Sequence, residues 1–169
     1  MRVLPLAVAA IAASISMAPM AFADDLTLPD RKPGLWELRT QPAGMPQPIV
    51  AQMCLDPESD KAMMKIGLSM SECESMTVNH DGDTMLVDAT CDVMGAKLKS
   101  HTVITGDFQS AYEMKTVSDR ISGSTDLPDH SEVTQSAKWV GDCPADMAPG
   151  DMMMPGGMKM NILKMLGGG

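Results

Sequence analysis

The chain has 169 residues, of which 44% are hydrophobic but only 3% aromatic, and its formal net charge is −9. This length suffices for one compact domain rather than two. Nucleic acids and anionic membranes are bound through basic surfaces, so the acidic balance argues against both as partners.

Residues 1–23 have the pattern of a cleavable secretory signal peptide. Arg2 supplies a positive start, an uncharged apolar run follows, and Ala21-Phe22-Ala23 ends the run with small residues at the cleavage positions. Polar residues and a proline interrupt the run, which makes it a poor transmembrane anchor. We therefore expect cleavage after Ala23, a periplasmic or secreted mature chain, and no membrane span in that mature chain.

The mature part predicts short strands separated by turns. Several segments show the period-two alternation of a half-buried strand, and Asp81-Gly82 between two of them is a hairpin signal. The predicted strands are 34–41, 48–55, 73–80, 83–94, 96–108, 109–119 and 131–142. Residues 56–67 predict one helix, with Asp56 as its cap and Gly67 as its stop.

These elements predict a mainly β fold, an antiparallel meander that forms a small barrel or a curled sandwich with one short helix. We assign residues 24–143 to this β domain. From Pro144 onward, prolines, glycines and isolated methionines prevail, so 144–169 is expected to be a flexible extension. A short helix at 158–166 is the alternative for that tail.

The four cysteines, all in the mature part, predict two disulfide bonds, and three pairings are possible. If Asp81-Gly82 is a two-residue turn, Cys73 and Cys91 point to opposite faces, and joining them would need a bulge. Alternation carries the inward orientation of Trp139 on to Cys143. We therefore predict the pairs Cys54–Cys73 and Cys91–Cys143, which would leave no free thiol.

No catalytic motif is present. The histidines His80, His101 and His130 are scattered, and neither a zinc-protease motif, a serine nucleophile elbow nor a phosphate-binding loop occurs. The sequence thus predicts a protein that is not an enzyme and needs no cofactor. Trp36 and Trp139 are expected to anchor the core rather than to stack on a ligand.

The methionines of the tail form one chemically suggestive cluster. Thioether sulfur is a soft ligand suited to Cu(I), and the candidate ligands are Met152, Met153, Met154, Met158 and Met160. The general abundance of methionine in this chain and sacrificial oxidation are competing explanations. Copper or other metal handling is therefore the alternative function.

The leading hypothesis is an exported, non-enzymatic β domain that binds a small apolar ligand or serves as an envelope component.

Five landmarks occur in a characteristic order along the chain. They are the segments Pro33-Gly34-Leu35-Trp36-Glu37, Cys54 with the following Asp-Pro-Glu, Cys73 and Cys91 around a hairpin, Gly106-Asp107-Phe108, and Trp139-Val140-Gly141-Asp142-Cys143. In this order the chain resembles the bacterial domain of unknown function family 3617, over about residues 31–151. The resemblance implies an exported, largely β, disulfide-bonded domain, and it implies no activity.

Overall fold

The computed structural model describes residues 29–69 and 72–167, so the predicted signal peptide at 1–23 lies outside the described part. One antiparallel sheet dominates, in the strand order β3-β4-β5-β6-β7-β1-β2-β8-β9. The strands are β1 Gly34–Pro42, β2 Ile49–Leu55, β3 Glu72–Asp81, β4 Thr84–Val93, β5 Ala96–Asp107, β6 Ala111–Gly123, β7 His130–Gly141, β8 Asp151–Met153 and β9 Lys159–Asn161. The helices are α1 Pro57–Ser69 and α2 Ile162–Gly167.

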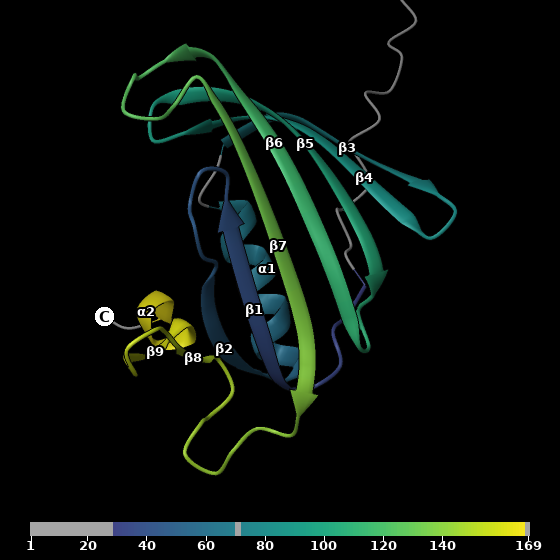
Figure 1. Ribbon diagram of the computed structural model, residues 1–169, viewed down its shortest axis with the longest axis vertical. Coiled ribbons are helices and arrows are strands. Elements are labelled where there is room, and N and C mark those ends of the chain that lie inside the picture. The colour runs from purple at the N-terminus through teal and green to yellow at the C-terminus, as the bar shows by residue number, and fades with distance from the viewer. Residues whose placement is uncertain (1–28, 70–71, 168–169) are drawn as a thin grey trace, which may run out of the picture.

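The predicted fold class is confirmed, and each of the seven predicted strands and the predicted helix is present. The barrel is the part of the prediction that is wrong. The strands β3 and β9 stand at the two edges of the sheet and do not pair with each other, so the sheet stays open. Figure 1 shows it curving around α1, with the long strands β5, β6 and β7 at its centre.

The buried core lies on the face of the sheet that is turned toward α1, which we call the inner face. Side chains alternate between faces along a strand, and the register brings buried ones side by side: Trp36 is opposite Met53, and Leu38 is opposite Ala137. The cluster continues across the sheet through Tyr112, Ile104 and Met85, and Met63 of α1 packs against it. The other side, the outer face, carries many polar residues, such as Asp88 opposite His101, and some apolar ones, such as Leu86 opposite Val103.

The disulfide pairing differs from the prediction. Cys54 is bonded to Cys143 and Cys73 to Cys91, so the predicted pairs Cys54–Cys73 and Cys91–Cys143 are wrong. Two details of the β3–β4 hairpin explain the error. Its turn lies one residue later than expected, because Asp81 is opposite Thr84, and the register shifts between Cys73 and Ser75. That irregularity supplies the bulge that a Cys73–Cys91 bond requires.

The segment after Pro144 forms regular structure where its composition predicts a flexible extension. β8 adds to the edge of β2, β9 pairs with β8, and the amide of Gly150 donates to the carbonyl of Cys54 at 2.9 Å. The Cys54–Cys143 bond explains this difference, since it holds the start of the tail beside the free edge of β2. α2 covers part of the helix considered at 158–166.

Within the residues that the structure describes, neither helix is both long and apolar enough to pass through a membrane.

Candidate functional site

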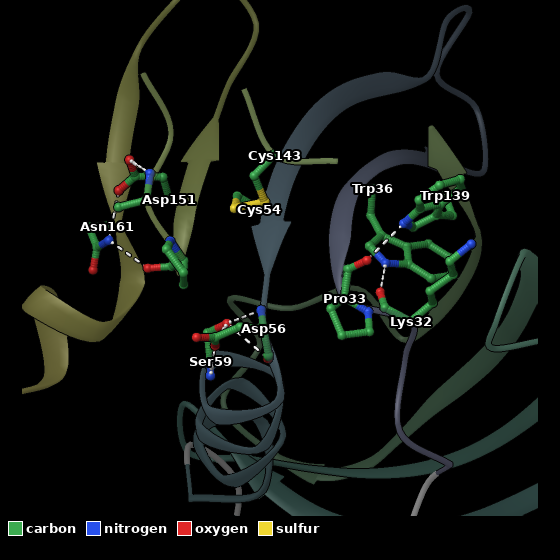
Figure 2. The surroundings of a disulfide bond; sticks show 12 residues. Lys32, Pro33, Trp36, Cys54, Asp56, Ser59, Trp139, Cys143, Asp151 and Asn161 are labelled. Atoms are coloured by element: carbon green, nitrogen blue, oxygen red, sulfur yellow. Dashed lines mark hydrogen bonds between the residues drawn. A yellow bond between two sulfur atoms is a disulfide. The ribbon is translucent and has the colours of Figure 1, made fainter. Parts of the chain in front are cut away.

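Two tryptophans lie at one end of the sheet. We call this place the tryptophan end, and its residues are Lys32, Pro33, Gly34, Trp36 and Trp139. The indole Nε1 of Trp36 donates to the carbonyl of Lys32 at 2.8 Å, and the Nε1 of Trp139 donates to the carbonyl of Pro33 at 3.0 Å. Figure 2 shows both bonds meeting on the short segment that precedes β1. The Lys32 ammonium lies 3.5 Å from the centre of the Trp139 ring, a cation–π contact.

Gly34 is the residue that lets this segment approach so closely. Its φ of +131° is one that side-chain-bearing residues rarely adopt. A Cβ atom at this position would lie 2.4 Å from the carbonyl oxygen of Gly141 and 2.5 Å from Nε1 of Trp139. The landmark glycine therefore has a steric role, and the hydrogen bond of the Trp139 indole depends on it.

Phe108, from another landmark, reaches the same end. Its ring stacks on Tyr112 with a centroid distance of 4.6 Å, and its carbonyl accepts a hydrogen bond from the amide of Lys32 at 3.0 Å. Tyr112 in turn contacts Trp36, with ring centroids 5.8 Å apart. Landmarks that are far apart in the sequence thus form one packed aromatic group.

The Cys54 landmark begins helix α1. The amide of Ser59 donates to the carboxylate of Asp56 at 2.7 Å, and the amide of Asp56 donates to Ser59 Oγ at 2.8 Å, which is reciprocal capping (Figure 2). The hydrogen bond from the Ser59 amide is the largest cause that lowers the pKa of Asp56. Asp56 thus caps the helix, as its sequence predicts.

A buried ion pair that the sequence analysis missed ties α1 to the start of the domain. Asp60 is 1% exposed, and its carboxylate accepts hydrogen bonds from the amide of Arg31 at 3.0 Å and from Arg31 Nε at 2.6 Å. Arg31 Nη1 also donates to the Tyr112 hydroxyl at 3.3 Å. One sequence signal does indicate that Asp60 is buried. Asp60 precedes Met63 by about one helical turn, so it shares the face of α1 that packs against the core. Because Arg31 engages both oxygens, this carboxylate holds the helix in place and is poorly placed to act as a base.

The histidines do not converge. His101 Nδ1 bonds to Asp88 at 2.8 Å, and His130 bonds to Asp119 at 2.7 Å and to Glu132 at 3.3 Å. The bond to Asp119 is the largest cause that raises the pKa of His130. All of these pairs lie on the solvated outer face. Among the described residues, no three histidine, cysteine or acidic side chains are placed to hold a metal ion.

A shallow, open hollow of about 540 Å³ lies on the outer face over β1, β5, β6 and β7. Its lining includes the small residues Ala111 and Ser136 and the charged residues Glu37, Arg39 and Lys138. Glu37 and Arg39 neutralise each other at 2.9 Å. A lining that holds charges of both signs does not suit a small apolar ligand, so a site for such a ligand has to be sought on the inner face.

The methionines predicted as copper ligands lie on the β8–β9 hairpin. Met152 and Met160 are opposite each other, and Met152 packs against the core cluster. Met153 points to the other face because it follows Met152 on the strand, while Met154 and Met158 flank the turn, where the amide of Met154 donates to the carbonyl of Met158. The hairpin thus brings the five residues into two neighbouring pairs, Met152 with Met160 and Met154 with Met158, and leaves Met153 apart. Cu(I) binding by these residues stays a prediction.

The fold and the tryptophan end define the structural class of this protein. It is an open antiparallel sheet with two disulfide bonds and a buried tryptophan, Trp36. The model of the family described as protein of unknown function (DUF3617) matches residues 31–143, and the chain belongs to this family. Neither the curated proteins nor the solved structures contain a match. The matched range begins at Arg31 and ends at Cys143, so it spans the whole tryptophan end and stops before β8.

Proposed function

We propose that this protein is an exported, non-catalytic domain that binds a small apolar ligand on the inner face of its curled sheet. One observation carries the proposal. Met63, Val78, Val87 and Met114 pack against the buried core and yet remain only partly buried themselves. A ligand seated there would remove further apolar surface from water, at about 25 cal/mol for each Å².

The open sheet gives a reason why this surface is left incomplete. In a sandwich, a second sheet covers the inner face, and in a closed barrel the opposite strands do so. Here β3 and β9 stay apart, and α1 is the main element on the inner side of the long strands (Figure 1). The strands β4, β5 and β6 therefore carry apolar side chains beyond the part that α1 covers.

Export and the absence of catalysis belong to the same proposal. Disulfide bonds form and persist in oxidising, extracytoplasmic compartments, and the described cysteines are all paired. Residues 1–23 add the signal-peptide pattern. Against catalysis, the Asp60 carboxylate is engaged by Arg31, and the histidine–carboxylate pairs lie on the solvated outer face.

Binding of a neutral apolar fluorophore, N-phenyl-1-naphthylamine, tests the proposal. We expect saturable binding to the wild-type protein and binding about tenfold weaker to Met114→Trp, whose larger ring would occupy the inner face. Lys115→Trp is the matched control, because the next residue on β6 is exposed on the outer face and its replacement should leave binding unchanged. Thermal melts confirm that both variants fold. If the wild-type protein shows no saturable binding, an envelope component that holds no such ligand is the better description.

A further inference from the structure

The side chains on the inner face of β6 change from apolar to polar and then to charged along the strand. Every second residue shares this face, which gives the series Tyr112, Met114, Thr116, Ser118 and Arg120. The series begins in the buried core, continues through hydroxyl groups, and ends in a cation. Thr102 of β5 faces Thr116 with their hydroxyls 3.0 Å apart, and Leu98 of β5 is opposite Arg120. A ligand lying along this strip would meet apolar surface at one end and a positive charge at the other.

The guanidinium group of Arg120 is only partly paired. Its Nε is buried and, among the described residues, has no hydrogen-bond partner. Its side chain is 16% exposed, and one guanidinium nitrogen, Nη2, contacts the carboxylate of Asp129. A buried donor without an acceptor costs free energy, so this Nε is a donor that an acceptor oxygen of a ligand would satisfy. Arginine presents its nitrogens as a planar fork that fits a carboxylate.

Asp129, the acid that contacts Arg120 among the described residues, is held weakly. Asp129 is 84% exposed and lies just before β7, so water solvates most of its carboxylate. Ion pairs with such exposed partners contribute little. An incoming carboxylate could therefore replace Asp129 at small cost, and its second oxygen could reach the Nε side of the fork.

We propose that the ligand of the inner face is an amphiphile with one alkyl chain and an anionic carboxylate head, and that Arg120 binds the head. The inference rests on the proposed function, because the chain would lie against the same partly buried residues that include Met114. Met114 and Arg120 are six residues apart on one strand, about 20 Å between their Cα atoms, so an alkyl chain that starts at Arg120 runs along the strip toward Met114 and covers the larger part of that distance. That span suits an extended chain better than a compact ring.

Calorimetric titration with decanoate and with decan-1-ol, both kept below the concentrations at which they aggregate, tests the inference. The two probes share the chain and differ in the charge of the head. We expect the wild-type protein to bind decanoate about tenfold more tightly than decan-1-ol, since one charge-assisted contact is worth about that ratio. Equal affinities would overturn the inference and leave the proposed function standing. If neither probe binds, the proposed function fails, and the inference fails with it.

Two substitutions assign the preference to Arg120. Arg120→Gln should remove the preference for decanoate and leave decan-1-ol binding unchanged, whereas Arg39→Gln, on the outer face, should keep both affinities. Asp129→Asn provides a test that does not depend on how well Arg120→Gln folds. It removes the competing carboxylate, so decanoate should bind several-fold more tightly and decan-1-ol as before. A preference for decanoate that survives in Arg120→Gln would refute the assignment.

Discussion

The region around the Cys54–Cys143 bond, next to the tryptophan end, and the β3–β4 hairpin each contain a disulfide bond, yet they are built in opposite ways. In the first region, Trp36 and Cys54 are completely buried. In β3, by contrast, eight of ten residues are exposed and the other two are only partly buried. The Cys54–Cys143 bond joins residues 89 positions apart, whereas the Cys73–Cys91 bond joins neighbouring strands over 18 positions.

The difference shows that the same covalent bond has two structural roles in this molecule. The Cys54–Cys143 bond adds to a region that packing and hydrogen bonds already define, and it connects the tail to β2. The Cys73–Cys91 bond holds an edge strand that has few apolar contacts of its own. An edge strand that pairs on one side only depends on such local devices, and the bulge beside Cys73 belongs to them.

Removing each disulfide in turn would test this comparison most strongly. On the loop-entropy model, closing 89 residues stabilises the folded state by about 4–5 kcal/mol and closing 18 residues by about 3 kcal/mol. We expect the double substitution Cys54→Ser with Cys143→Ser to lower the free energy of unfolding more than Cys73→Ser with Cys91→Ser does. Urea denaturation of both variants provides the measurement, and the opposite order would contradict the comparison.

Gly34→Ala should produce the next largest effect. The added methyl group would overlap the carbonyl of Gly141 and the indole of Trp139, in addition to the strain of a positive φ. We expect a loss of about 3 kcal/mol in the free energy of unfolding. Gly44→Ala is the matched control, because Gly44 also has a positive φ, +83°, but has open space around it. That control should cost about 1 kcal/mol, and equal losses would remove the steric role assigned to Gly34.

The pH dependence of stability should show the smallest effect, with opposite signs at two positions. The pKa of His130 is raised in the folded state, so its contribution is complete below the unfolded pKa of about 6.5 and is lost as the pH rises through the folded pKa. The pKa of Asp56 is lowered, so its contribution is present above about 3.9 and is lost as the pH falls through the folded pKa.

Unfolding curves of His130→Gln and Asp56→Asn between pH 3 and pH 9 would separate the two groups. His130→Gln should be less stable than the wild-type protein at pH 5 and equal to it at pH 9. Asp56→Asn should show its deficit at pH 7 and lose it toward pH 3. The effect at His130 is small because water surrounds its partners, and a deficit that grows with rising pH would contradict the assigned sign.

The strands were predictable because their alternation is local. A half-buried strand such as β4 places Met85, Ala89 and Cys91 on one side through its own sequence, and the helix cap at Asp56 depends on its immediate neighbours. The disulfide pairing was not predictable in this way. Moving a turn by one residue, or inserting one bulge, changes which side chains face each other, and both occur between Cys73 and Cys91.

The tail and the buried ion pair escaped prediction for a related reason. β8 is a three-residue strand that exists through its pairing with Gln52 and Met53, and its composition alone gives no periodic signal. Arg31 and Asp60 are 29 positions apart, so their contact depends on where the fold brings the start of the domain. Long-range pairing determines both features, and local propensity does not encode it.

The position of β1 between β2 and β7 has a consequence for the order of folding. β3 to β7 form a meander in which each strand pairs with the next one along the chain, so these contacts can develop hairpin by hairpin. β1, in contrast, receives β7 only after nearly a hundred further residues have been arranged, and contacts of such large sequence separation form slowly. We therefore expect pairing of β1 with β7 to be the late, rate-limiting step, and until it occurs Trp36 lacks its neighbour Trp139 on β7.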